Sequence, residues 1–368
     1  MRIGLDVSLI GEGMTGIGYS VLELARALPD INPNAEWLLI GTSNSDLLPS
    51  GANIQKVPGP GPCGWKRTCW TQTELPRIVR RLGIDLLHCP DISRPASCSV
   101  PVVSTVHDLS YYGREVFFPS GKKYYKRLMT HLSVNRSGAL ATVSEFTRQE
   151  VVERFHVSPD RISAIYPGIS ETVFPPAEGK KRPYLFFVGN LERRKNLTRL
   201  VEAYAQFRRS SGLPHQLILA GIPGFGWHQT LKAISTCGFE KDILVPGYLS
   251  RDEVLKLYSG AAAFIFPSLY EGFGLPLLEA MSAGIPVACS SVGAVKEVAG
   301  SAALFFDPRN IEEIASAIEQ VVSSDTLRDS LRQLGYERVK PFSWARCALQ
   351  YNELYRNTIG AQRTASAS

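Results

Sequence analysis

The stretch from Ala263 to Ile285 constrains the fold more than any other part of the chain. It opens with a short apolar run, Phe264-Ile-Phe266, which is too brief for a helix and predicts a buried strand. Gly272 and Gly274 follow, and a helical pattern then runs from about Pro276 to Ala283. The order of strand, glycine loop and helix is typical of an α/β protein with a parallel sheet.

The start of this helix predicts a binding site for an anion. The backbone N–H groups of Phe273, Gly274 and Leu275 carry the partial positive charge of a helix N-terminus, which favours a phosphate. Glu271 lies just before the helix, and Glu279 lies inside it. Because carboxylates only accept hydrogen bonds, two of them beside a phosphate indicate a ligand that also carries sugar hydroxyls. The alternative is that this segment is only a strand-turn-helix corner without a ligand, in which Glu279 lies on the solvated face of the helix.

Composition sets the broad class of the protein. A chain of 368 residues is too long for one typical core and predicts two domains, and 44% hydrophobic with 20% charged residues is typical of a globular protein. No apolar run approaches the roughly 20 residues of a membrane span. The charge at Asp6 leaves no room for a signal-peptide core, so we expect a cytoplasmic protein.

Charge and cysteine usage narrow the possible partners. A net charge of +6 permits contact with an anionic membrane but does not require nucleic acid, and no nucleic-acid partner is expected. The seven cysteines are scattered without a Cys-x-x-Cys pair, so neither a disulfide framework nor a zinc site is expected. No Asp-x-Asp occurs in the chain, and we expect neither a metal nor another cofactor.

The first half of the chain alternates short apolar runs with helical patterns. A glycine loop from Gly11 to Gly18 precedes a helix that begins near Tyr19; its spacing fits a dinucleotide fingerprint poorly, and tight turns alone could explain it. His107 follows the run from Val102 to Val106. Ligands bind where the strands of a parallel sheet end, so His107 is either a site residue or a packed or solvated histidine. The predicted strands are at 2–8, 37–40, 84–90, 102–106, 139–143 and 162–166.

The second half repeats this alternation after a linker at 173–183 that is rich in proline, glycine and charge. A buried run from Tyr184 to Val188 leads into the loop Gly189-Asn-Leu-Glu-Arg193-Arg194-Lys195-Asn196, and a helix follows. Cations at a helix start oppose the helix dipole, so we interpret the three cations of this loop as a phosphate clamp rather than as exposed surface charges. Further strands are expected at 216–220, 243–245 and 304–306.

Basic residues interleave with aromatic and apolar ones from Ser120 to Met129, on a predicted helix. A helix with one solvated face and one apolar stripe packed in the core explains this pattern. A surface that binds an anionic membrane explains it too. The sequence leaves both interpretations open.

The string from Pro267 to Pro276, followed by Glu279-Ala-Met-Ser-Ala-Gly284-Ile-Pro286, resembles the Glu-x7-Glu signature of the retaining glycosyltransferases of family 4. The resemblance covers nearly the whole chain. It implies the GT-B architecture, in which two Rossmann-like doubly wound domains face a central cleft and a C-terminal helix crosses back to the N-terminal domain. On this pattern the domains span 1–172 and 184–340 and the helix spans 341–358. Residues 359–368 are expected to be disordered.

The resemblance also implies roles for the candidate residues. Glu271 would orient the donor sugar and stabilise positive charge at its anomeric carbon, and Glu279 would hold the ribose hydroxyls. His107 would contact the donor sugar. The loop at Gly16 and Gly18 would close over the donor diphosphate and the acceptor.

The phosphate clamp is where the chain departs from the family. Lys195 matches the family lysine that binds the donor diphosphate. Many members carry arginine directly after the first glycine of this loop, and here that position is Asn190. Asn190 is still expected to lie among the residues that bind the donor. The second cation would then come from Arg193 or Arg194, and we expect Arg194 because it adjoins Lys195. Tyr248 could stack on the nucleotide base.

These features predict a retaining, metal-independent glycosyltransferase that moves a hexose from a nucleotide-diphosphate sugar to a glycan or lipid-linked acceptor. The loop at 189–196 is similar to that of bacterial mannosyltransferases of polysaccharide and O-antigen assembly, so GDP-mannose is the first donor expected. The enzyme would lie in the cytoplasm, with peripheral contact at the inner face of the membrane. The alternatives are a non-catalytic nucleotide-sugar-binding protein and a dinucleotide-dependent oxidoreductase.

Overall fold

The computed structural model describes residues 1–11, 14–42, 46–62, 64–113, 115–170, 174–175 and 183–367. The chain divides into two compact units. Unit 1 comprises Met1–Tyr112, Ser120–Ser170 and Phe342–Ser368, and unit 2 comprises Gly113–Pro119 and Glu171–Pro341. Most of the predicted linker at 173–183 lies outside the described residues.

Unit 1 is built on a parallel sheet in which, counting described residues only, seven strands follow the order β3-β2-β1-β4-β5-β6-β7. Strand order reverses between β1 and β4, so the sheet is doubly wound as predicted. The carboxyl ends of these two strands meet at the reversal point. The strands are β1 (Arg2–Asp6), β2 (Glu36–Thr42), β3 (Ile54–Pro58), β4 (Leu86–Cys89), β5 (Val102–Val106), β6 (Ala139–Thr142) and β7 (Ile162–Ala164).

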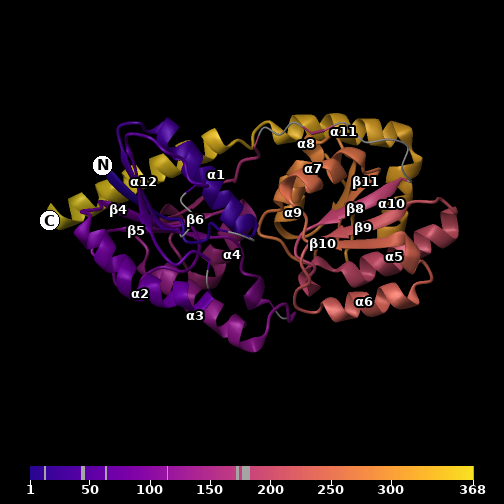
Figure 1. Ribbon diagram of the computed structural model, residues 1–368, viewed down its shortest axis with the longest axis horizontal. Helices are drawn as coiled ribbons and strands as arrows, with labels where there is room; N and C mark the ends of the chain where they lie inside the picture. Colours follow the sequence, from indigo (N-terminus) through magenta and orange to yellow (C-terminus); the bar gives the residue numbers. More distant parts are fainter. Residues whose placement is uncertain are drawn as a thin grey trace. The chain divides into compact units, whose positions relative to one another are not determined.

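Helices cover both faces of this sheet. α1 (Gly16–Ile31) and α12 (Trp344–Ala367) pack together on one face, and α2 (Gly64–Arg81) and α3 (Ser120–Arg136) lie on the other, as Figure 1 shows. α4 (Glu145–Phe155) begins at the predicted N-cap Ser144, whose side chain accepts a hydrogen bond from the backbone N–H of Thr147. α1 buries one helical stripe in the core, consisting of Val21, Leu22, Leu24, Ala25 and Leu28.

Two helix boundaries differ from the sequence expectation. α1 begins at Gly16 rather than near Tyr19, so Gly16 and Gly18 lie in its first turn instead of in an open loop. A Cβ atom at position 18 would lie 2.5 Å from the carbonyl oxygen of Leu9, which gives Gly18 a packing role. α12 continues to Ala367, so the segment expected to be disordered is helical almost to its end.

Unit 2 repeats the doubly wound plan. In the described part of the chain its parallel sheet has the order β10-β9-β8-β11-β12-β13. The order reverses between β8 and β11, so the loops that follow these two strands lie side by side. The strands are β8 (Tyr184–Val188), β9 (Gln216–Ala220), β10 (Ile243–Gly247), β11 (Ala263–Phe266), β12 (Val287–Ser290) and β13 (Leu304–Phe306).

In unit 2, α5 and α6 lie on one face of the sheet, and α7 and α8 lie on the other (Figure 1). The helices are α5 (Leu197–Ser211), α6 (Trp227–Thr236), α7 (Arg251–Gly260), α8 (Leu275–Ser282), α9 (Gly293–Ala299), α10 (Ile311–Ser323) and α11 (Asp325–Val339). A search of the described residues finds no helix that is apolar and long enough to cross a membrane. The six cysteines that lie in this part of the chain are free thiols, and Cys63 lies outside it.

Candidate functional site

Glu271 lies between two cations of the loop that follows β8. Lys195 Nζ is 2.5 Å from Glu271 Oε1, and Arg194 Nη1 is 2.7 Å from Glu271 Oε2. Both Lys195 and Glu271 are buried. The two loops follow neighbouring parallel strands, β8 and β11, which is why residues far apart in the sequence meet here. The structure thus brings together three of the predicted catalytic residues, Glu271, Lys195 and Arg194; the fourth, His107, belongs to unit 1.

Burial and the neighbouring charges together determine the pKa values of the side chains in this cluster. Burial raises the pKa of the Glu271 carboxyl, but Arg194 and Lys195 outweigh that effect and hold its pKa below the usual value. Burial lowers the pKa of the Lys195 ammonium, and Glu271 opposes this effect. Lys195 Nζ also lies 5.0 Å from the centre of the Phe266 ring. Glu271 is therefore an ionised acceptor at neutral pH, suited to hold a hydroxyl or to stabilise positive charge.

Arg193 and Arg194 point to different surroundings. Arg194 Nε and Nη2 both donate to Glu192 Oε1, at 3.1 and 2.9 Å, while its Nη1 also donates to the Tyr270 carbonyl at 2.9 Å. Arg193 is exposed, and its backbone N–H donates to the Phe225 carbonyl at 2.8 Å. Only Arg194 of the two contacts Glu271 within the described residues. Glu192 was not among the sequence candidates, although its position two residues before Arg194 could have suggested a pair.

Asn190 and Asn196 sit at the two ends of this loop. Asn190 is exposed, and its carbonyl accepts a hydrogen bond from the backbone N–H of Glu192 at 2.9 Å. Asn196 is buried in a left-handed conformation with φ 59°. Sequence reasoning overlooked Asn196, and the signal it missed was that asparagine tolerates this conformation directly before a helix.

Glu279 is held by two residues of the preceding helix. Its Oε1 is 2.5 Å from Arg251 Nη1, and its Oε2 accepts a hydrogen bond from the Tyr258 hydroxyl at 3.0 Å. Both partners lie on α7, and neither was a sequence candidate. The carboxylate is thus fixed in place, and the alternative of a freely solvated Glu279 does not hold.

The predicted anion-binding site lies at the N-terminus of α8. The helix starts at Leu275, one residue earlier than expected, behind Gly274 with φ 115°, and no side chain of the described residues caps it. Phe273 is buried. The Gly274 conformation is one that glycine adopts readily, which explains the residue type at this turn. Tyr248 follows β10, and 64% of its surface is exposed.

His107 lies in unit 1, at the end of β5. Its Nε2 is 2.7 Å from the Pro90 carbonyl oxygen, which can only accept, so Nε2 carries the hydrogen and Nδ1 is left as an acceptor. Burial lowers the pKa of the imidazole, which is therefore neutral at pH 7. His107 also lines a small, mostly apolar cavity with Thr105 and Trp344.

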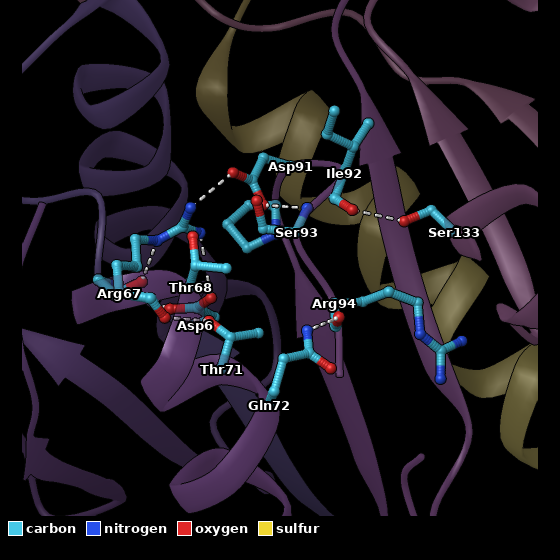
Figure 2. A network of polar contacts seen from close by, with 12 residues as sticks. Asp6, Arg67, Thr68, Thr71, Gln72, Asp91, Ile92, Ser93, Arg94 and Ser133 are labelled. Atoms are coloured by element: carbon cyan, nitrogen blue, oxygen red, sulfur yellow. Dashed lines mark hydrogen bonds and ion pairs between the residues drawn. The ribbon is translucent and has the colours of Figure 1, made fainter. Parts of the chain in front are cut away.

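A second charged cluster lies in unit 1 (Figure 2). Arg67 of α2 lies 3.4 Å from Asp6 and 3.0 Å from Asp91, and its Nε donates to Ser8 Oγ at 2.7 Å. Burial raises the pKa of Asp6, and Arg67 opposes this effect. These contacts tie α2 to the carboxyl ends of β1 and β4, a structural role that the sequence did not suggest for Asp6.

No group of three or more His, Cys, Asp or Glu side chains is placed to hold a metal ion in the part of the chain that the structure describes.

Both halves of the chain match models of glycosyltransferase families. Residues 14–173 match the family model of glycosyltransferase family 4, and residues 169–338 match that of glycosyl transferases group 1. The O-antigen chain mannosyltransferase B of Escherichia coli is 32% identical over 265 residues, which span 69% of this chain and 70% of that protein.

Solved structures confirm the GT-B fold. Sucrose-phosphate synthase of Thermosynechococcus elongatus matches 98% of this chain and 100% of its own, with a TM-score of 0.80 and 20% identity. The HepE protein of Anabaena, solved in complex with UDP and glucose, matches 96% of this chain and 99% of its own, with a TM-score of 0.73 and 17% identity.

Proposed function

We propose that the chain, which belongs to glycosyltransferase family 4, transfers a hexose with retention of configuration from a nucleotide-diphosphate sugar to a glycan or lipid-linked acceptor. The observation that carries this proposal is Glu271, an ionised buried carboxylate held by Lys195 and Arg194 directly before the N-terminus of α8. A carboxylate suits the positive charge that develops on the sugar. Lys195 and the helix N-terminus suit the leaving diphosphate.

Mannose from GDP-mannose is the proposed donor. The relative from Escherichia coli is a mannosyltransferase of the O-antigen chain, which supports both this sugar and a polysaccharide or lipopolysaccharide acceptor. A nucleotide diphosphate as carrier is supported by the HepE structure, which contains UDP and glucose. In this scheme Glu279 holds the ribose hydroxyls, His107 accepts a hydrogen bond from a donor hydroxyl, and Tyr248 stacks on the base. The departing phosphate helps to take the proton of the acceptor hydroxyl.

We further propose that the protein works in the cytoplasm in peripheral contact with an anionic membrane. The contact surface, which we name the α2–α3 patch, consists of Trp65, Tyr124 and Leu128, whose surfaces are 72%, 69% and 63% exposed. The two helices are linked by Thr68 Oγ1 and the Tyr125 hydroxyl, 3.1 Å apart. α3 carries the cations Lys122, Lys123, Lys126 and Arg127 and contains no Asp or Glu. Exposed aromatic and apolar groups beside cations are typical of a surface that binds anionic lipids.

The experiment that tests the transfer is a screen of nucleotide sugars, by thermal shift and by release of nucleoside diphosphate. Glu271→Gln should lower kcat about 100- to 1,000-fold, because one preorganised charge at the transition state is lost. Glu279→Ala should weaken binding of the nucleoside diphosphate by about 1 to 3 kcal/mol. Asp252→Asn, on the same helix as Arg251, is the control variant.

Enzyme turnover should also survive excess EDTA, because Lys195 and the N-terminus of α8 neutralise the leaving diphosphate in place of a metal. Reversible loss of activity with EDTA that manganese restores would contradict the metal-free mechanism. A protein that binds nucleotide sugars without turning over any acceptor would instead be a binding protein.

A further inference from the structure

Lys195 and Arg194 hold the same carboxylate but are anchored very differently. Arg194 makes hydrogen bonds to the Glu192 carboxylate, the Tyr270 carbonyl and the Glu271 carboxylate. For Lys195 Nζ, the structure of the described residues gives Glu271 Oε1 as the one hydrogen-bond partner. The arginine is therefore fixed by hydrogen bonds on several sides, whereas the lysine has one hydrogen bond, to Glu271, and a weaker contact with the face of the Phe266 ring.

This difference decides which cation can move toward a ligand. A guanidinium is a rigid planar fork, and turning that of Arg194 would break hydrogen bonds to Glu192 and Tyr270 as well as to Glu271. The ammonium of Lys195 is a compact charge on a flexible stem, and it gives up a single hydrogen bond when it turns. An incoming diphosphate can therefore attract Lys195 at much lower cost than Arg194.

We infer that Lys195 leaves Glu271 for the donor diphosphate, whereas Arg194 stays on Glu271 as a positioning residue that Glu192 holds in place. The inference rests on the proposed function and differs from the expectation that Arg194 is the second phosphate ligand. Departure of Lys195 exposes Glu271 Oε1 to the donor sugar, while Oε2 keeps its bond to Arg194.

The charge balance supports this assignment. The cluster of Glu192, Arg194, Lys195 and Glu271 has no net charge when all four side chains are ionised. Once Lys195 turns to the diphosphate, the remaining three carry one net negative charge. That charge lies where positive charge develops on the sugar in the transition state, so it lowers the barrier to transfer. Glu192 thus acts on the reaction through Arg194.

The test compares two quantities in the same variants: the affinity for GDP and UDP by calorimetry, and kcat for transfer. Lys195→Ala should weaken nucleoside-diphosphate binding by about tenfold or more. Arg194→Ala and Glu192→Ala should leave that affinity within about threefold but lower kcat by about 100-fold. Glu192→Gln, which keeps an oxygen acceptor for Arg194, should recover part of the lost kcat. Arg193→Ala, the exposed neighbour, should change both quantities far less.

Two results would overturn the inference. One is an Arg194→Ala variant that loses nucleoside-diphosphate affinity as strongly as Lys195→Ala does. The other is a folded Glu192→Ala or Glu192→Gln variant with wild-type kcat. In the double variant Glu192→Ala/Arg194→Ala, kcat should be no lower than in Arg194→Ala, because Glu192 acts through Arg194. Wild-type protein that binds neither GDP nor UDP would contradict the proposed function itself.

Discussion

Asn196 links three segments of unit 2 through one buried side chain. Its Nδ2 donates to the Pro267 carbonyl at 3.1 Å and to the Pro308 carbonyl at 2.6 Å. Its Oδ1 accepts a hydrogen bond from Arg199 at 2.9 Å. Because Asn196 directly follows Lys195, these contacts set where the Lys195 loop lies against the segment that leads to Glu271.

Two substitutions separate the backbone and side-chain contributions of Asn196. Asn196→Gly keeps the left-handed φ but loses the buried hydrogen bonds, so the free energy of unfolding should fall by about 1 to 3 kcal/mol. Asn196→Ala loses the same bonds and adds a strained backbone, which costs about 1 kcal/mol more. Denaturant unfolding should therefore rank wild type above Asn196→Gly and Asn196→Ala last.

His156 provides the matched control for this ranking. It has a similar φ of 53°, but it is exposed at the end of α4. His156→Gly relieves the backbone without breaking buried hydrogen bonds, so it should leave the protein as stable as wild type or more stable. An Asn196→Ala variant as stable as Asn196→Gly would show that the left-handed conformation is not what selects asparagine here.

At the scale of elements, α12 is tied to the sheet of unit 1 through buried polar groups. His88 of β4 lies 2.7 Å from the Tyr355 hydroxyl through Nδ1 and 2.9 Å from Thr105 Oγ1 through Nε2. Thr105 Oγ1 in turn lies 2.9 Å from the Tyr351 hydroxyl. Both tyrosines belong to α12, so the histidine joins the C-terminal helix to β4 and β5.

Acid should weaken this connection. Burial lowers the pKa of His88 from 6.5 to about 3, so the folded protein binds fewer protons than the unfolded chain between those values. Stability therefore rises with pH in this window and is lost as pH falls from 6.5 towards 3, by at most about 1.4 kcal/mol per pH unit from this group. Urea unfolding across that range should show the loss.

The variant His88→Gln isolates this contribution. It removes the titrating imidazole, so its unfolding free energy should depend less on pH than that of wild type, even if it is lower throughout. Burial also lowers the pKa values of His107 and His215, so some pH dependence of the same sign will remain. His131→Gln, at an exposed position of α3, is the control. Identical pH profiles for His88→Gln and wild type would refute the assignment.

At the scale of the whole molecule, the α2–α3 patch should direct the protein to anionic lipid. Vesicles of phosphatidylcholine with added phosphatidylglycerol should bind the protein at least about tenfold more tightly than phosphatidylcholine alone, and salt should weaken this binding. Trp65 should show a blue shift of its emission on binding, since it is the exposed tryptophan of the patch. Leu128→Ser combined with Lys123→Gln should lower vesicle binding without changing transfer to a soluble acceptor.

A matched pair on another helix controls for general surface changes. Leu231→Ser with Lys232→Gln alters an exposed leucine and an exposed lysine of α6, and it should leave vesicle binding unchanged. Equal binding of the patch variant and the wild type would show that the patch is not a membrane surface. A wild-type dimer that the patch variant converts to monomer would show instead that the patch joins two copies of the chain.

The sequence alone determined most of the secondary structure and the candidate residues of the site. Apolar runs of strand length and helical spacing depend on nearby residues, so β11, α8, β8 and α5 lie close to their predicted ranges. Glu271 was predicted from its place before a helix N-terminus and from the Glu-x7-Glu resemblance, and Lys195 and Arg194 were predicted as cations at a helix start. These residues meet because the strands before their loops are adjacent in a doubly wound sheet.

The tertiary structure decided which side chains meet. Arg194 and Glu271 are 77 residues apart in the chain, and only the packing of the two loops shows that Arg194 rather than Arg193 reaches the carboxylate. The support of Glu192 for Arg194, the pairing of Glu279 with Arg251, and the tethers of Asn196 likewise depend on contacts between segments. A local pattern records burial and backbone preference, whereas a hydrogen bond between distant residues depends on positions that only the folded sheet fixes.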